Sequence, residues 1–251
     1  MLTRINKIYI SVIVPVYNEG ANISQFISSL ESSVKIKHEV LIIYDFDKDD
    51  TIPVVNRLKD KFINIKLIKN IFGPGLINAC KTGFKKARAD FIVVIPGDLA
   101  DEPKTINNMY KLAIKDCDIV CASRYCSGGK QLGGNFVKSF LSKFAGLTTP
   151  ILLGIPTSDL TNGFKMYNRR IFKKINIESQ GGWEFTMEIL IKAHFLGFKI
   201  AETPSIWKER SAGKSKFKLL RWLPGYVYWY FWGVSKRSKF CLNRWIPSSA
   251  E

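Results

Sequence analysis

Apolar and polar positions follow two different periods in the first half of the chain. Short continuous runs of β-branched and apolar residues predict buried strands, and apolar residues spaced three or four positions apart predict helices with one buried face. Strands are predicted at residues 9–14, 40–44, 65–68, 91–95 and 118–122. Helices are predicted between them, at residues 20–31, 51–62, 75–87 and 104–115.

This alternation predicts an α/β fold with a mainly parallel sheet and helices on both faces, because strands joined by helices run parallel. The second half is less regular, with helices predicted at residues 136–147 and 184–196 and short strands at 199–202 and 205–208. Ligands of such folds bind beyond the carboxyl ends of the strands. The polar side chains at those ends are therefore the candidates for a functional site.

The composition narrows the classes of partner. The chain of 251 residues is 46% hydrophobic and has 38 Lys and Arg against 21 Asp and Glu, a formal net charge of +17. This excess favours phosphorylated small molecules, anionic lipid or nucleic acid. No nucleic-acid-binding module or basic helical stripe is recognisable, so we predict no nucleic-acid partner. Two histidines make a histidine metal site or a Ser-His-Asp triad improbable, and five cysteines without a CxxC pair indicate reduced thiols in a cytosolic protein.

Three segments carry candidates for nucleotide binding. PVYNEG, after the first strand, places Tyr17 where it can stack on a base and Glu19 where it can accept from ribose or base. YDFDKDDT, after the second strand, places Asp45 where it can accept from a nucleobase N–H. Capping of the following helix is the alternative for Glu19, since acidic groups are favoured there. Gly73 and Gly75 before the next helix resemble a phosphate-binding turn, but without GxGxxG or a Walker lysine.

An acidic cluster, IPGDLADEP, follows the fourth predicted strand. A carboxylate at a strand end suits Mg²⁺ or Mn²⁺ bridged to a diphosphate, because these ions take further oxygens from substrate and water. Asp98 is the candidate ligand. Asp101 is either its helper or, with Glu102, an acid at the start of the next helix.

Two glycine-containing basic loops, SRYCSGGK and ERSAGKSKFK, follow later strands. Arg124 ends the fifth strand and can clamp a phosphate with two parallel hydrogen bonds. Arg210 and Lys214 lie in the second loop, a candidate lid over phosphates. Ordinary basic surface loops are the alternative for both segments.

In this order, the segments resemble the family 2 glycosyltransferases of the GT-A fold, and most closely the dolichol-phosphate mannose synthase branch, which makes polyprenyl-phosphate sugars. The resemblance covers about residues 9–218, and its most specific segment is TSDLTNGFKMY. IPGDLADEP occupies the place of the family's metal motif, Asp-Ala-Asp-Leu-Gln. Asp98 falls on its second aspartate, while Pro96 and Ala100 replace two expected ligands.

The resemblance implies a role for each matching residue. The nucleotide-binding residues would be Pro15, Tyr17, Glu19, Asp45, Gly75, Arg210 and Lys214. The acceptor phosphate would meet Arg124, Lys138 and Ser142, and the metal would meet Asp98 and Asp101. The catalytic residues would be Asp98, Arg124, Asp159 and Arg210. Asp159 would contact the sugar or hold its loop, with capping of the following turn as the alternative.

The implied reaction is an inverting transfer of a sugar from GDP-mannose or a UDP-hexose to a polyprenyl or dolichyl phosphate at the membrane surface. The acceptor phosphate is largely ionised near neutral pH, since its second pKa is ~6, and needs no general base. One alternative is a family 2 transferase that uses a glycan or diacylglycerol as its acceptor. The other is a non-catalytic nucleotide-sugar or polyanion-binding protein with a degraded metal site.

The end of the chain changes character, from aromatic to basic. We expect residues 1–217 to form the glycosyltransferase domain and residues 218–251 an amphipathic tail at the membrane interface. LLRWLPGYVYWYFWGV is interrupted by Arg221, Pro224 and Gly225 and falls short of the ~20 apolar residues of a spanning helix. Packing of the tail on the core is the alternative. We predict a cytoplasmic protein held peripherally at an anionic membrane surface, or by a membrane-protein partner.

Overall fold

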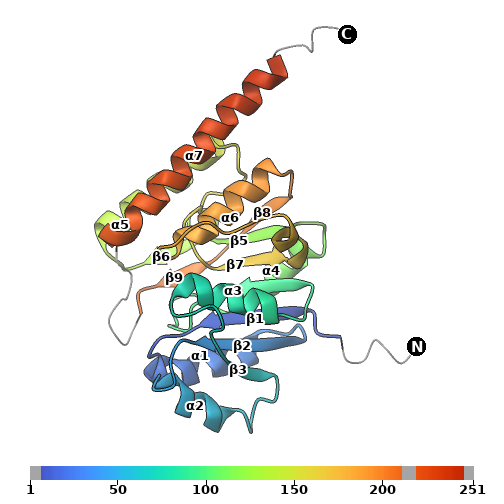
Figure 1. Ribbon diagram of the computed structural model, residues 1–251, viewed down its shortest axis with the longest axis vertical. Coiled ribbons are helices and arrows are strands. Elements are labelled where there is room, and N and C mark those ends of the chain that lie inside the picture. The colour runs from blue at the N-terminus through green and yellow to red at the C-terminus, as the bar shows by residue number, and fades with distance from the viewer. Residues whose placement is uncertain (1–6, 211–218, 246–251) are drawn as a thin grey trace, which may run out of the picture.

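The computed structural model describes residues 7–210 and 219–245, and its centre is a seven-stranded sheet (Figure 1). The strand order is β3-β2-β1-β4-β7-β5-β8. The strands are β1 (Ile10–Pro15), β2 (His38–Tyr44), β3 (Ile65–Lys69), β4 (Phe91–Val94), β5 (Ile119–Ser123), β7 (Lys165–Asn168) and β8 (Ile200–Pro204). β7 runs antiparallel to β4 and β5, and the other neighbours pair in parallel. The predicted α/β fold with a mainly parallel sheet is confirmed.

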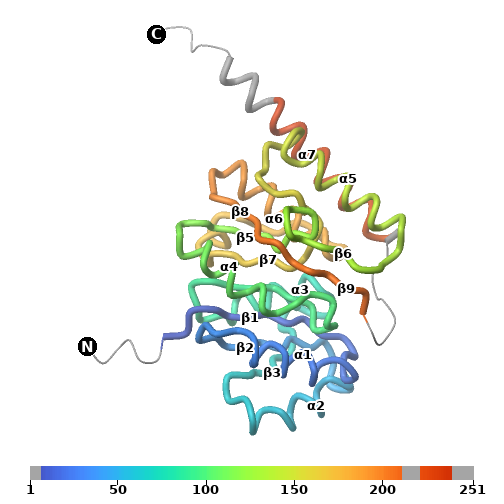
Figure 2. Tube along the Cα trace, turned by 180° about the vertical axis from the view of Figure 1, so that it is seen from behind, coloured from blue at the N-terminus to red at the C-terminus, as the bar shows by residue number. Residues whose placement is uncertain are grey.

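Helices cover both faces of the sheet (Figures 1 and 2). One apolar core lies under α1 (Gly20–Ser33), α2 (Thr51–Leu58) and α4 (Thr105–Ala113), and the other under α3 (Leu76–Lys86) and α6 (Glu184–Phe195). Successive side chains of a strand point to opposite faces. In β1, Val12 and Val14 therefore enter the first core and Ile13 the second. Continuous apolar runs are needed in these strands because both of their faces are buried.

The second half adds a small sheet and two long helices. β6 (Lys130–Leu132) pairs with β9 (Ile206–Lys208) outside the main sheet. α5 (Phe136–Leu152) and α7 (Leu219–Trp245) lie side by side at one end of the molecule (Figures 1 and 2). None of the helices in the described part of the chain is both long and apolar enough to cross a bilayer.

Part of the C-terminal segment packs on the core, as the alternative interpretation of the tail predicts. Trp229 of α7 is 3% exposed and donates from Nε1 to Ser179 Oγ at 2.8 Å. Gly233 lies so close to the core that an added Cβ would clash with Leu153 and crowd Ile191. The proposed boundary between residues 217 and 218 stays a prediction.

Four elements differ from the expected pattern. β6, β7 and a 3₁₀ helix, η2 (Arg169–Lys173), are absent from the predicted elements, and α5 continues past residue 147 to Leu152. β7 was missed because its short KMYN segment has no regular spacing of apolar residues. This omission matters most for the site. Its antiparallel direction brings the preceding loop to the edge where β4 and β5 end.

Candidate functional site

One edge of the sheet gathers most of the predicted site residues. β1, β2, β4 and β5 all end there, and the loop before β7 arrives from the opposite direction. Glu19, Asp45, Asp98, Arg124 and Asp159 therefore come from five separate segments to the same edge. Lys214 lies outside the described residues.

Asp45, just after β2, ties two loops together. Its Oδ2 accepts from the backbone N of Gly75 at 2.9 Å, and its Oδ1 accepts from Asn70 Nδ2 at 2.9 Å. Gly75 has a φ of 121°, a backbone conformation that glycine adopts readily and other residues rarely do. The carboxylate thus holds the glycine turn that begins α3, next to the place predicted for the nucleotide.

Two aromatic rings meet in the loops after β1 and β2. Tyr17, two residues after Pro15 ends β1, is 51% exposed and meets Phe46 edge to face, with ring centroids 5.3 Å apart. An exposed aromatic face can stack on a nucleobase, in agreement with the role predicted for Tyr17. Phe46 is absent from the predicted residues, although its position next to Asp45 in the sequence is a usable signal.

Arg210 connects the ends of β1 and β4. Its Nη2 donates to Asp98 Oδ2 at 2.8 Å and to Glu19 Oε1 at 3.3 Å. The three side chains are 13%, 20% and 9% exposed, respectively. Burial lowers the pKa of Arg210, but the two carboxylates outweigh it and raise that pKa above its ordinary value. A predicted phosphate-binding residue and a predicted metal ligand are thus in direct contact.

Asp98 and Asp101 are the two carboxylates that the sequence predicts as ligands of a divalent cation. Asp101 is 4% exposed, and its Oδ1 accepts from Asn162 Nδ2 at 3.4 Å. Burial and the charge of Asp98 raise the pKa of Asp101 to about 7. Carboxylate oxygens are ligands that suit Mg²⁺ and Mn²⁺. Within residues 7–210 and 219–245, no group of three or more His, Cys, Asp or Glu could hold a metal, so substrate oxygens and water would have to complete the shell.

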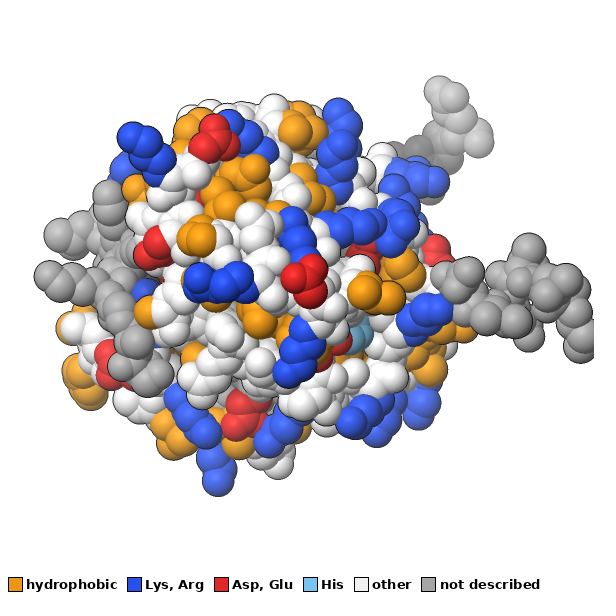
Figure 3. All heavy atoms as spheres, turned by 90° about the horizontal axis from the view of Figure 1, so that it is seen from below, with side chains coloured by type: hydrophobic (Ala, Val, Ile, Leu, Met, Phe, Trp, Pro, Cys, Tyr) orange, Lys and Arg blue, Asp and Glu red, His pale blue; other side chains and the backbone are white. Residues whose placement is uncertain are grey.

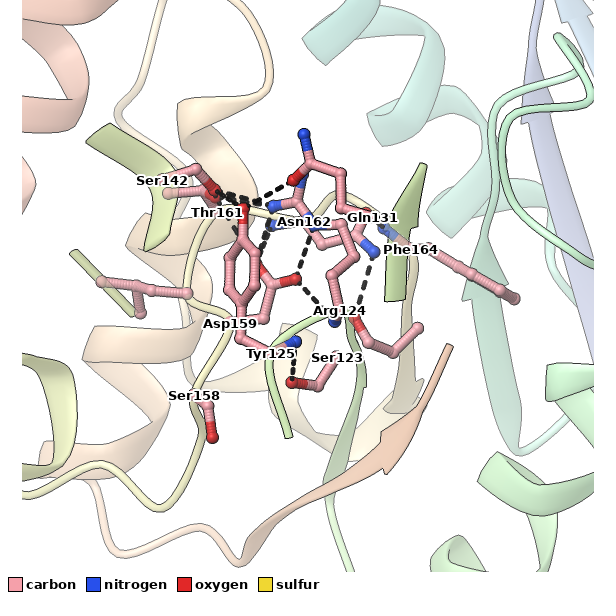
Figure 4. A network of polar contacts seen from close by, with 12 residues as sticks. Ser123, Arg124, Tyr125, Gln131, Ser142, Ser158, Asp159, Thr161, Asn162 and Phe164 are labelled. Atoms are coloured by element: carbon pink, nitrogen blue, oxygen red, sulfur yellow. Dashed lines mark hydrogen bonds and ion pairs between the residues drawn. The ribbon is translucent and has the colours of Figure 1, made fainter. Parts of the chain in front are cut away.

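Arg124 and Asp159 form a buried ion pair between β5 and the loop before β7 (Figure 4). Arg124 donates from Nε to Oδ2 at 2.7 Å, from Nη2 to Oδ1 at 2.8 Å and from its backbone N to Oδ2 at 3.0 Å. The side chains are 11% and 0% exposed. Burial opposes the ionisation of Asp159, but Arg124 outweighs it and holds the pKa of Asp159 below its usual value. Asp159 thus orients the arginine predicted to meet the acceptor phosphate.

Hydroxyl groups surround the same guanidinium (Figure 4). Nη2 of Arg124 also donates to Ser142 Oγ at 2.8 Å and to Thr161 Oγ1 at 3.0 Å. The Tyr125 hydroxyl donates to Gln131 Oε1 at 2.8 Å. Ser142 is a predicted site residue, whereas Thr161, Tyr125 and Gln131 are not. Thr161 lies in TSDLTNGFKMY and Tyr125 directly follows Arg124, which are the signals that could have found them.

Lys138 lies in the first turn of α5, one helical turn before Ser142, so the two residues share a side of the helix. The helix begins at a cap, where Asn135 Oδ1 accepts from the backbone N of Lys138 at 3.2 Å. The contact of Lys138 with an acceptor phosphate stays a prediction.

Lys165, the first residue of β7, is a fully buried cation that the sequence motifs did not single out. Its Nζ donates to the backbone oxygens of Leu160 and Asn162. Burial lowers the pKa of Lys165. By binding these two carbonyl groups, Lys165 holds the loop that carries Asp159 against β7. It thereby supports the Arg124–Asp159 ion pair from the core.

A protein-family model described as glycosyl transferase family 2 matches residues 11–176. The chain belongs to glycosyl transferase family 2. The matched range begins in β1 and ends after η2, so it includes Asp98, Arg124 and Asp159 but not Arg210.

Curated relatives of this family 2 member include two enzymes of lipid-phosphate glycosylation. A dolichol-phosphate mannosyltransferase from Pyrococcus furiosus is 30% identical over 212 residues, which cover 83% of this chain and 59% of the relative. A dolichyl-phosphate beta-glucosyltransferase from Dictyostelium discoideum is 30% identical over 230 residues, covering 84% of this chain and 69% of the relative. The chain thus spans 59% of the length of the archaeal relative.

A solved structure shows the same GT-A fold. Glucosyl-3-phosphoglycerate synthase from Mycobacterium tuberculosis, in complex with Mn²⁺, UDP and glucosyl-3-phosphoglycerate, superposes with a TM-score of 0.63. The match covers 96% of this chain and 81% of that chain, at 17% sequence identity. The predicted fold and family are therefore confirmed, while the roles of single residues remain predictions.

Proposed function

We propose that this family 2 member transfers a sugar from GDP-mannose or a UDP-hexose to a polyprenyl or dolichyl phosphate, with inversion at the anomeric carbon. The observation that carries the proposal is the Arg124–Asp159 ion pair with the Ser142 hydroxyl beside it. These residues would form a phosphate-binding group: Arg124 follows β5, Asp159 precedes β7, and Ser142 lies on α5, a helix with exposed apolar side chains. The names of the two curated relatives contain the same class of acceptor.

α5 has apolar side chains on the outside of the molecule. The rings of two of them, Phe140 and Phe144, stack with centroids 6.4 Å apart. Large exposed apolar patches commonly mark interaction surfaces, and lysines flanking them favour anionic lipid. Lys138 and Lys143 alternate with these apolar residues in the sequence. The exposed apolar residues of α5 are Phe136, Val137, Phe140, Leu141, Phe144, Leu147, Ile151 and Leu152.

The proposed chemistry rests on charge and positioning. Arg124, oriented by Asp159, would take the acceptor phosphate together with Ser142 and Lys138. Asp45 and Tyr17 would hold the nucleotide, and Arg210 would take the departing diphosphate. No side chain has to remove a proton, because the second pKa of a phosphate monoester is about 6.

Asp98 and Asp101 would hold a divalent cation, Mg²⁺ or Mn²⁺. The bound ion supplies positive charge to the diphosphate of the donor. The Mn²⁺ in the mycobacterial structure supports a divalent ion of this kind.

We also propose that the protein works at an anionic membrane surface, with the apolar stripe of α5 in the lipid interface. The alternative of nucleic acid as the anionic partner has less support. The face seen in Figure 3 has Lys and Arg side chains spread among uncharged and acidic ones, without a continuous basic stripe. A membrane-protein partner is a further prediction that awaits a pull-down from solubilised membranes.

The deciding experiment incubates the protein with radiolabelled GDP-mannose, UDP-glucose and UDP-N-acetylglucosamine, polyprenyl phosphate and Mn²⁺, followed by organic extraction. We expect one donor to give a lipid-linked sugar with the inverted anomeric configuration. Asp98→Asn should lose most of its activity, and Asp60→Asn, which removes a charge from an exposed site, should be active. The absence of lipid-linked product with every donor would overturn the proposal. Product on a glycan or diacylglycerol instead would identify the alternative acceptor class.

A further inference from the structure

Asp98 contacts one positively charged group of the chain, Arg210, and is the proposed ligand of another, a divalent cation. Its Oδ1 accepts from the backbone N of Ala100 at 3.1 Å, and its Oδ2 accepts from Arg210. Both oxygens of the candidate metal ligand are thus engaged within the chain. We infer that Arg210 and a divalent cation are alternative partners of Asp98, so that the cation is taken up with the nucleoside diphosphate rather than before it. This inference rests on the proposed function.

The position of Arg210 is set by the neighbouring backbone. The residue before it, Glu209, donates from its N to Leu132 O at 2.9 Å and accepts at Oε2 from Gly134 N at 3.1 Å. Lys208 N donates to Ala100 O at 2.8 Å, which joins β9 to the loop that carries Asp98. These hydrogen bonds fix the backbone just before Arg210 and so place its guanidinium next to Asp98.

A divalent cation at Asp98 would stand next to this guanidinium. Like charges in a poorly exposed site repel strongly, because little water screens them. Glu19 offers the guanidinium a second acceptor, at 3.3 Å, so Arg210 stays paired when Asp98 turns to the cation. A diphosphate adds oxygens that both cations can share. Binding of the cation and of the nucleoside diphosphate should consequently be cooperative, and the coupling must be reciprocal.

The test measures Mn²⁺ binding without turnover. The electron paramagnetic resonance signal of free Mn²⁺ is followed in titrations of the protein alone, the protein with UDP or GDP, and the nucleotide alone as a blank. Without nucleotide, Arg210→Gln should bind Mn²⁺ more tightly than the wild type, within the roughly 5–150-fold range of coupled sites. Addition of the nucleotide should tighten Mn²⁺ binding more in the wild type than in the variant.

Two variants serve as controls. Arg170→Gln removes an arginine paired with Asp118 at the start of β5, the opposite edge of the sheet, and should bind Mn²⁺ like the wild type. Asp98→Asn, added to Arg210→Gln, should abolish the tight binding and so locate the ion. In the wild type, Mn²⁺ should raise the affinity for UDP or GDP by the same factor, a measurement that needs no variant.

Equal Mn²⁺ affinity of the wild type and Arg210→Gln without nucleotide would overturn the inference. So would an absence of Mn²⁺ binding in both, or nucleotide binding unaffected by Mn²⁺. None of these outcomes decides the proposed function, because the lipid-linked product is measured separately. A failure to form that product, with cooperative Mn²⁺ binding intact, would instead remove the proposed acceptor.

Discussion

The proposed nucleotide side and the proposed acceptor side of the site are built in different ways. On the nucleotide side, Asp45 reaches loops beside the next strand through partly exposed hydrogen bonds. On the acceptor side, Arg124 and Asp159 are nearly excluded from solvent and come from β5 and the loop before antiparallel β7. A partly exposed contact contributes little to stability, whereas a broken buried pair leaves a charge without solvent or partner. The acceptor side should therefore tolerate substitution less well.

The largest effect expected is from Asp159→Ala. It leaves the buried guanidinium of Arg124 uncompensated, and removal of one partner from such a pair costs about 3–5 kcal/mol. Urea unfolding followed by circular dichroism measures the loss. A loss no larger than that caused by Asp45→Ala would remove the contrast between the two sides.

Asp98→Asn should separate activity from stability. We expect turnover to fall by about 10²–10³-fold, the typical effect of removing one electrostatic group from an active site. The free energy of unfolding should change by less than about 1 kcal/mol, because Arg210 keeps Glu19 as a partner. Product formation and urea midpoints are measured on the same preparations. Full activity in the variant would refute the ligand assignment.

The double variant Phe140→Ser/Phe144→Ser should release the protein from membranes. A buried phenylalanine contributes about 1.5–3 kcal/mol, so sedimentation with vesicles containing phosphatidylserine should weaken by at least about tenfold. Stability should hold, since both rings are exposed. Phe72→Ser is the matched control, because Phe72 is an exposed ring on the nucleotide side. An equal loss of binding in the control would refute a specific role of α5.

Asp45→Ala should have a smaller and more local effect. Two accepted hydrogen bonds are lost, which together cost about 1–2 kcal/mol of unfolding free energy. We expect the KM for the donor to rise and the KM for the acceptor to stay constant in steady-state assays. A change in acceptor KM would show that the two sides are coupled.

The smallest effect expected is a pH dependence at the opposite edge of the sheet, where His38 begins β2. Burial lowers the pKa of His38, but hydrogen bonds to Glu31 and the Ile36 carbonyl outweigh it and raise that pKa above 6.5. The contribution to stability is therefore complete below pH 6.5 and is lost as pH rises through the folded-state pKa. His38→Gln should remove this slope in urea midpoints measured above pH 6.5. An unchanged slope would assign it to another group.

Strands and helices of the first half were predictable because their side chains enter continuous cores. β1, β2 and β4 have apolar runs, and each of them is nearly or fully buried. β7 was not predictable, because its KMYN segment is a strand only through pairing with β4 and β5 on either side. Lys165 is buried there because its ammonium group binds backbone oxygens. The spacing of apolar residues in the sequence cannot predict the burial of a lysine.

The site was predictable as a set of residue types and not as a set of contacts. Charged residues after strands indicated the edge where we expect ligands. Asp98 and Arg124 follow strands at that edge, and Asp159 precedes β7 there. The partners are distant in sequence, however: Arg210 meets Asp98 across 112 positions and Glu19 across 191. Such pairing depends on which strands are neighbours, and local sequence does not carry that information.

The sequence by itself determined the family, the mainly parallel sheet and the polar residues at its carboxyl edge. It could do so because apolar periodicity is local and because seven motifs occur in one order. Only the tertiary structure decided that β7 runs antiparallel, that Asp159 thereby reaches Arg124, and that Arg210 occupies Asp98. It also decided that the apolar side of α5 faces outward, because a helical pattern shows where apolar side chains lie but not what covers them.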